Sequence, residues 1–295
     1  MHPLTFFPLF PLVQAWKPPN YPSYTLLFSD SFAGPSGSLP NKSHWNIIDG
    51  FPDINNELQT YIPDSRYVQH SGGETLQLVP WQNNATAKGW ASGRVESSFT
   101  FKPSDGKKTM IEASISLGDY PLPVKRGIAP SFFLQGERIR RGTEWPACGE
   151  FDVMQVKIGL DEDIDGFGTM HCDVHPGGIC NEPKGLQGVV EVPGMGHGWN
   201  RWRVVWDRTG ECWECERAVW YLNGEEYWAV EGKKIGNEVV WEDTVREDMF
   251  FVLGVAVGGD WAGSPTEETA DGYGSMMEVG YVAFTSLWTA SRIDS

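Results

Sequence analysis

The sequence predicts an all-β fold in which antiparallel sheets pack as a sandwich, and three observations support this prediction. Short runs of β-branched and aromatic residues recur along the chain, and many are bounded by Gly, Pro, Asn or Asp. Segments with helical periodicity are scarce. Asn223-Gly224 separates two such runs, and this dipeptide tolerates the positive φ angles of a tight hairpin turn.

Each expected strand is a short run that fits a pleated, half-buried surface. In chain order these runs are residues 24–29, 75–79, 95–101, 110–116, 131–134, 149–155, 168–174, 203–206, 218–222, 250–256 and 277–284. The 295 residues contain no internal repeat and no low-complexity linker. One domain over residues 16–295 is therefore expected.

Composition and charge narrow the class of partner. The chain has 14 Trp, of which most are expected to close a broad β core and the rest to stack on sugar rings. The formal net charge is −16, which argues against nucleic acid and anionic membrane surfaces as partners. Neutral polysaccharides remain open, whereas sulfated or carboxylated ones are disfavoured. Beyond the N-terminus, no apolar run reaches the roughly 20 residues that span a bilayer.

The first 15 residues are apolar apart from His2, Thr5 and Gln14, and they end in the small-residue pattern of a cleavage site. They are expected to be a secretory signal peptide, so the protein is expected to be secreted. The alternative is an irregular arm, because no Lys or Arg precedes the run and three prolines interrupt it. Asn41 and Asn84 begin N-glycosylation sequons, which fit export.

Five cysteines also fit an oxidising compartment. Cys172 with Cys180, and Cys212 with Cys215, are plausible bridges closing short loops, although spacing alone does not fix connectivity. Cys148 is then the remaining thiol, expected as a small buried hydrophobe.

The run from Trp145 to Gln155 contains the candidate catalytic residues. Side chains alternate along a strand, so Glu150 and Asp152 point the same way. A β-bulge at Val153-Met154 would return Gln155 to that face. Two acids on one face repel, and they persist where one is a nucleophile and the other tunes it. The plainer alternative is an exposed acidic strand face.

This run resembles the signature of glycoside hydrolase family 16, in which Glu-x-Asp-x-x-Glu supplies nucleophile, helper and acid/base. Four other segments, in the same order, are similar to family motifs: residues 55–61 (Asn-Asn-Glu-Leu-Gln-Thr-Tyr), 90–95 (Trp-Ala-Ser-Gly-Arg-Val), 199–206 (Trp-Asn-Arg-Trp-Arg-Val-Val-Trp) and 255–261 (Val-Ala-Val-Gly-Gly-Asp-Trp). The segments around Cys148 and from Cys172 to Pro183 are similar to fungal members in particular. The resemblance covers about residues 25 to 285.

The resemblance implies a β-jelly-roll sandwich of two antiparallel sheets with a long concave substrate cleft. It implies Glu150 as nucleophile and Asp152 as helper. Gln155 stands in place of the acid/base and cannot donate a proton as a carboxylic acid does. General acid catalysis contributes about 10²–10⁴-fold, so a slowed hydrolase is expected, least affected on activated leaving groups.

Further residues are assigned to the site by the same resemblance. Asn56, Glu57 and Arg94 are expected to bind substrate near the reacting sugar. Trp145 is expected to stack on a sugar. His171 is expected beside the cleft, with a satisfied structural histidine as an equal alternative. No zinc spacing and no phosphate loop is present, so no metal and no cofactor is expected.

Two departures bear on function. Ala129 and Phe133 stand where the family usually has tryptophans, which would weaken sugar stacking. Residues 161–166 mimic the first half of a calcium loop, but position 172 is Cys rather than Glu, so an exposed acidic loop is favoured. Its acids are also candidates to replace the missing proton donor.

Three functions remain open on the sequence. The first is a secreted, retaining endo-β-glucan hydrolase or transglycosylase whose partner is a neutral β-glucan. The second is a glycan-binding protein without turnover. The third is an enzyme recruited to another substrate, for instance a small fungal metabolite, which the loss of Trp at Ala129 favours over the second. In each case the protein is expected to be a monomer.

Overall fold

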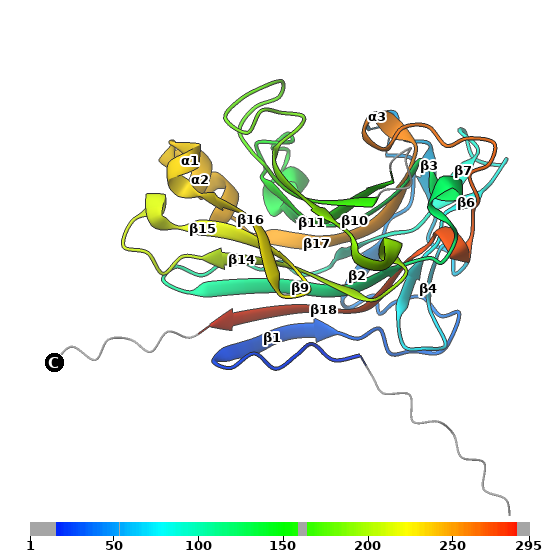
Figure 1. Ribbon diagram of the computed structural model, residues 1–295, viewed down its shortest axis with the longest axis horizontal. Helices are drawn as coiled ribbons and strands as arrows, with labels where there is room; N and C mark the ends of the chain where they lie inside the picture. Colours follow the sequence, from blue (N-terminus) through cyan, green and yellow to red (C-terminus); the bar gives the residue numbers. More distant parts are fainter. Residues whose placement is uncertain (1–15, 53, 159–163, 288–295) are drawn as a thin grey trace, which may run out of the picture.

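The computed structural model describes residues 16–52, 54–158 and 164–287. Two antiparallel sheets stack face to face, with β9, β14 and β18 in one layer and β10, β11 and β17 in the other (Figure 1). This confirms the predicted sandwich. Within the described ranges, the chain has no helix that is both long and apolar enough to cross a membrane.

One layer is an eight-stranded sheet. In spatial order its strands are β16 (Glu225–Glu231), β15 (Arg217–Leu222), β14 (Asn200–Asp207), β9 (Lys108–Leu117), β18 (Met277–Leu287), β5 (Leu76–Leu78) and β4 (Val68–His70), with β1 (Tyr24–Asp30) also paired to β18. The Asn223-Gly224 hairpin joins β15 to β16 as predicted, and both turn residues have positive φ.

The other layer is a seven-stranded sheet. Its strands, in spatial order, are β13 (Leu186–Glu191), β12 (Ile164–His171), β11 (Glu150–Ile158), β10 (Ile128–Gly136), β17 (Met249–Val257), β8 (Arg94–Ser97) and β2 (Trp45–Ile47). A third, small sheet joins β3 (Gln59–Tyr61), β7 (Trp90–Ser92) and β6 (Trp81–Gln82), with β3 parallel to β7.

Helices are few and short. They are α1 (Gly232–Ile235), α2 (Glu238–Val245) and α3 (Gly259–Ala262), with 3-10 turns η1 (Leu122–Lys125), η2 (Glu137–Arg141), η3 (Pro193–Gly196), η4 (Trp213–Cys215) and η5 (Tyr273–Ser275). The sequence analysis did not predict α2. Its N-terminus is capped by Asn237, whose side chain accepts hydrogen bonds from Val239 and Val240.

The core lies between the two sheets and is rich in indoles. Among the described residues, six tryptophans are buried: Trp45, Trp90, Trp202, Trp206, Trp220 and Trp241. Three more, Trp81, Trp213 and Trp228, are partly buried and pack against the core, so most tryptophans serve the core as expected. From β11 the core receives Phe151, Val153 and Met154. The opposite face of the seven-stranded sheet, here called the open face, therefore carries Glu150 and Asp152.

The cysteine expectations are confirmed. Disulfides join Cys172 to Cys180 and Cys212 to Cys215. Cys148 is free and buried, and its burial raises the pKa of the thiol to about 12, so this thiol is unreactive at neutral pH. The expected signal peptide, residues 1–15, lies outside the described residues, and the domain bounds remain a prediction.

Candidate active site

The predicted bulge is present on β11. Opposite β12, Asp152 pairs with Thr169 and Gln155 with Phe167, so three steps along β11 match two steps along β12. The register with β10 slips at the same place. The extra residue returns Gln155 to the open face together with Glu150 and Asp152. The three residues of the motif thus share one face, as the sequence analysis predicted.

Glu150 lies nearly buried at the start of β11. Gln135 on β10 donates a hydrogen bond to Glu150 Oε2 at 3.1 Å. Trp145 also donates a side-chain hydrogen bond to this carboxylate, and the charge of Arg94 acts on it. Burial and the neighbouring charge of Asp152 nevertheless raise the pKa of Glu150 to about 8. The neutral form of this carboxyl group is therefore more favoured than that of an exposed glutamate.

His171 lies directly opposite Glu150, on β12. Its Nε2 is 3.2 Å from Asp152 Oδ2 and 4.0 Å from Glu150 Oε1, and its Nδ1 is 2.7 Å from Glu182 Oε2. Burial alone would lower the pKa of His171, but the hydrogen bonds to Asp152 and Glu182 raise it well above its usual value. The ring is thus an imidazolium held between carboxylates, which compensates the buried charge of Asp152.

Glu182 was not among the predicted site residues. It is buried, and its second oxygen accepts a hydrogen bond from the backbone N–H of Cys172 at 3.0 Å. The disulfide between Cys172 and Cys180 closes the loop that brings Glu182 back to His171. The only sequence signal for this role was the position of Glu182 two residues after Cys180.

A second ionic cluster lies beside the first on the open face. Arg94 binds Glu96 at 2.7 Å, and Arg140 binds the other oxygen of Glu96 at 3.0 Å. The Arg94 guanidinium lies 5.4 Å from the centre of the Phe133 ring. Phe133, which stands where the family usually has a tryptophan, therefore packs against Arg94.

Asn56 and Glu57 were both expected to bind substrate, and they lie in different surroundings. Glu57 is partly buried, accepts a hydrogen bond from Gln59 at 2.6 Å and feels the charge of Arg94. Its pKa is raised by burial. Asn56 is exposed, and its amide donates to both carboxylate oxygens of Asp260 at 3.0 Å. Glu57 thus joins the cluster around Arg94, whereas Asn56 holds α3 in place.

Aromatic side chains flank the motif at both ends. The Trp145 ring lies 5.2 Å from that of His171, at the end occupied by Glu150. At the other end, Phe167 pairs with Gln155 across the strands and makes an edge contact with Trp261 at 5.4 Å. Ala129 is buried on β10 and offers no ring. Phe167 was missed because a lone Phe in a strand is most often core.

Glu150, Asp152 and His171 also have one ligand atom each within 4.8 Å of one another. Carboxylates and imidazole are common metal ligands. Here the ion pairs around His171 already compensate the carboxylate charge. The absence of a metal stays a prediction. The acidic loop at 161–166 lies partly outside the described residues.

Comparisons with known proteins agree with this geometry. No family model matches the sequence. The endo-1,3-β-glucanase from Streptomyces sioyaensis superimposes with a TM-score of 0.84 at 27% identity, over 92% of this chain and all of that chain. The α subunit of clotting factor G from Tachypleus tridentatus is 24% identical over 261 residues, which is 88% of this chain and 34% of that protein. Glucan endo-1,3-β-glucosidase A1 from Niallia circulans is 23% identical over 288 residues, 90% of this chain and 38% of that protein.

In fold and sequence the chain is similar to glycoside hydrolases, the class of proteins that act on O-glycosidic bonds. The chain spans about a third of the length of the curated relatives it matches. Within the class, the resemblance to glycoside hydrolase family 16 is confirmed. A further solved structure, described as a non-specific endo-β-1,3(4)-glucanase of that family, has the same fold with a TM-score of 0.67 at 19% identity.

Proposed function

We propose that this protein is a secreted, retaining endo-hydrolase of neutral β-1,3-glucan whose acid assistance is weak. The main support for this proposal is the bulge on β11, which brings Glu150, Asp152 and Gln155 to the open face. We assign them, in this order, to the positions of nucleophile, helper and acid/base. The glucanases among the similar proteins support the substrate class. The two disulfides support an oxidising compartment.

In this mechanism Glu150 attacks the anomeric carbon and forms a glycosyl-enzyme intermediate, which water then hydrolyses. Gln135 and Trp145 orient the carboxylate. Asp152 and His171 form a fixed ion pair beside it. The repulsion from Asp152 and the burial make the ionised form of Glu150 costly, and they also make it a stronger nucleophile once ionised.

The leaving oxygen receives no proton from the side chain at position 155, since an amide is not a general acid. General acid catalysis is worth about 10²–10⁴-fold, so turnover of glucan is slowed by a factor in that range. A leaving group that departs as a stable anion does not need this proton. We therefore propose that activated glycosides form the glycosyl-enzyme intermediate far less slowly than glucan does. Hydrolysis of the intermediate proceeds without a base at position 155, and the proton of the attacking water passes to solvent.

A non-hydrolytic glycan-binding function is the second candidate. It is favoured by the raised pKa of Glu150, because a neutral carboxyl group together with Gln155 gives an uncharged pair of hydrogen-bonding groups suited to a neutral sugar. A third candidate, turnover of a small molecule, is favoured by Ala129, because a small side chain there leaves no stacking platform for a sugar chain.

Turnover of laminarin and of mixed-linkage β-glucan by the purified protein tests these candidates. The matched variant is Glu150→Gln, which keeps the size of the side chain and its hydrogen bond to Gln135. Product release by the native protein that is abolished by Glu150→Gln supports the hydrolase. Binding of glucan that Trp145→Ala abolishes, without formation of product, identifies the second candidate. Neither binding nor turnover refutes the glucan proposal and leaves the small-molecule candidate.

A further inference from the structure

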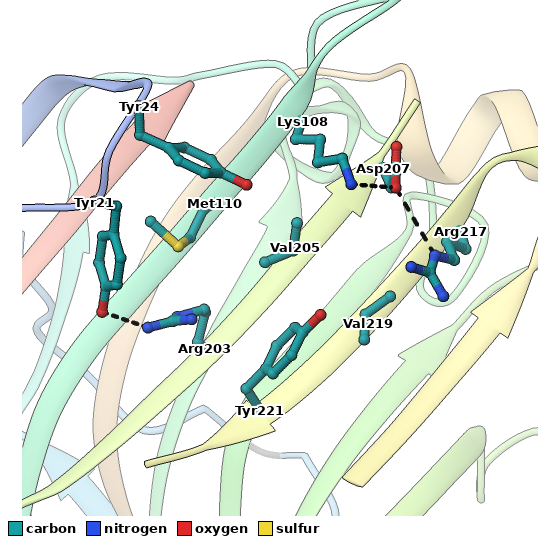
Figure 2. A pocket seen from close by; sticks show the side chains of 10 residues that line it. All are labelled: Tyr21, Tyr24, Lys108, Met110, Arg203, Val205, Asp207, Arg217, Val219 and Tyr221. Atoms are coloured by element: carbon teal, nitrogen blue, oxygen red, sulfur yellow. Dashed lines mark hydrogen bonds and ion pairs between the residues drawn. The ribbon is translucent and has the colours of Figure 1, made fainter. Parts of the chain in front are cut away.

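A second candidate site lies on the other side of the sandwich. The eight-stranded sheet turns one face to the core and the other, here called the outer face, away from it. A cavity of about 160 Å³ opens on the outer face, between the segment that precedes β1 and strands β1, β9, β14 and β15 (Figure 2). We call it the outer pocket.

The outer pocket has aromatic walls and an aliphatic floor. Tyr24 and Tyr221 lie on opposite sides of a floor that contains Met110 and Val205, as Figure 2 shows, and Tyr21 closes one end. The solvent-facing side of an antiparallel sheet is normally polar. Rings that flank an apolar floor give a flat ligand two stacking surfaces, which is how aromatic side chains bind sugar rings.

One wall is rigidly held by a buried ionic network. The Arg203 guanidinium lies 4.5 Å from the centre of the Tyr21 ring and 5.6 Å from that of Tyr221. Arg203 binds Glu112 at 2.6 Å, and Glu112 also accepts hydrogen bonds from the hydroxyls of Tyr21 and Tyr281. The Tyr21 ring is thus fixed before any ligand arrives, which lowers the entropy cost of binding at this end of the pocket.

The charges of the outer pocket are paired. At the rim, Lys108 binds Asp207 at 2.7 Å, and Arg217 lies 3.9 Å from the same carboxylate. Inside, Glu112 neutralises Arg203. These pairs offer hydrogen-bond donors and acceptors without a strong net charge. A ligand rich in hydroxyl groups satisfies them better than an ion does.

The outer pocket is large enough for only a small part of a glycan. At about 30 Å³ for each water molecule, a cavity of about 160 Å³ holds roughly five waters. That is room for one sugar ring and too little for a compact oligosaccharide. A longer chain would place one ring between Tyr24 and Tyr221 and leave its neighbours at the surface.

We propose that the outer pocket binds one pyranose ring of a neutral glucan chain, independently of the site on the open face. The nature of the glycan rests on the proposed function, whereas the site itself rests on the paired charges and the aromatic walls. The pocket holds the polymer, and the chemistry takes place on the opposite sheet.

Calorimetric titration with a β-1,3-linked glucose hexasaccharide tests the proposal, in a Glu150→Gln background to prevent hydrolysis. Two binding events per protein are expected. Tyr221→Ala removes one of them or weakens it at least about fivefold, in line with the loss of one stacking ring. Trp145→Ala removes the other, on the open face. Leu26→Ala is the matched control, because Leu26 is half exposed on β1 and does not line the pocket.

Each outcome separates the two proposals. Loss of binding in Tyr221→Ala, with the open-face event kept, supports the outer pocket. A single event that Trp145→Ala abolishes and Tyr221→Ala leaves intact overturns it while the proposed function stands. A single event lost only in Tyr221→Ala supports the pocket and removes the glucan site on the open face. Tyr24→Ala repeats the test from the opposite wall, and unchanged thermal unfolding establishes that each variant is folded.

Discussion

Gln155 is the residue at which this chain departs most from the chemistry that its fold supports. The side chain reaches the open face by way of the bulge and lies opposite Phe167. An amide and a carboxylic acid have almost the same shape, so the position is already built for an acid. The loss is chemical rather than geometric.

Gln155→Glu is accordingly expected to raise kcat on laminarin by about 10²-fold or more, since the introduced acid protonates the leaving oxygen. For an aryl glycoside with an acidic phenol, kcat/KM, which reports the first step alone, is expected to change little. Gln187→Glu, the same chemical change on the open face one strand beyond Thr169, is the control. Steady-state kinetics on both substrates decide the matter, and an equal rise in kcat/KM on both would contradict an acid at position 155.

The pH dependence of turnover follows from Glu150. Its pKa is raised to about 8, and only the ionised form attacks. As pH rises toward 8 the ionised fraction grows, so kcat/KM is expected to increase and then to level off. No alkaline decline is expected while position 155 carries an amide, because no acid is lost there. In Gln155→Glu the profile should become bell-shaped. A native profile in which kcat/KM does not rise with pH would contradict ionisation of Glu150 as the controlling step.

At the level of the element, the start of β11 depends on α2. Gly149 precedes the strand with φ +80°, and a Cβ added there would lie 3.3 Å from Thr244 Cα on α2. The left-handed backbone and this tight contact both disfavour a side chain at position 149. The residue just before Glu150 thus packs closely against a helix that the sequence did not predict, and a shift there would be passed on to Glu150.

Gly149→Ala is expected to destabilise the protein by about 1–2 kcal/mol, the cost of a non-glycine residue in a left-handed conformation. It should also lower activity beyond what the fraction of folded protein explains, because Glu150 shifts. Denaturant unfolding and kinetics on the same sample measure both. Gly224→Ala is the control: it has positive φ as well, but its added Cβ meets nothing within 4 Å and it lies in a remote hairpin. Full activity in Gly149→Ala would contradict the role of α2.

The sequence predicted long elements well and short ones poorly. All eleven expected runs overlap strands, and the bulge was predicted from the spacing of Glu150, Asp152 and Gln155. The strands β3, β6 and β7 are two or three residues long and show no alternation that could reveal them. The helix α2 was missed because eight residues are too few to show a clear helical periodicity, although Asn237 caps them.

For the site, prediction succeeded where residues share a strand and failed where they meet through folding. Glu150 and Asp152 follow from alternation along β11. Glu182 contacts His171 from a loop, and Gln135 contacts Glu150 from the neighbouring strand β10. Local sequence does not encode such contacts. Their positions depend on strand register and on the Cys172–Cys180 bridge.

On the scale of the whole molecule, the charge of −16 acts on any polymer that approaches. Neutral laminarin should bind with little dependence on salt. Sulfated laminarin of the same length is expected to bind more weakly at low salt, with the difference shrinking as ionic strength shortens the Debye length toward roughly 8 Å. Affinity electrophoresis at several salt concentrations measures this. Tighter binding of the sulfated polymer would contradict a preference for neutral glycans.

The bridge between Cys172 and Cys180 couples the charge state of the site to the redox state of its surroundings. Cys172 follows His171 directly, and Glu182 comes two residues after Cys180. With the thiols reduced, nothing covalent keeps the Glu182 carboxylate on the imidazolium, and the pairing with Asp152 loses its support. A chain held in a reducing compartment would rely on the two hydrogen bonds of Glu182 alone, to His171 and to the backbone of Cys172, to keep this electrostatic arrangement.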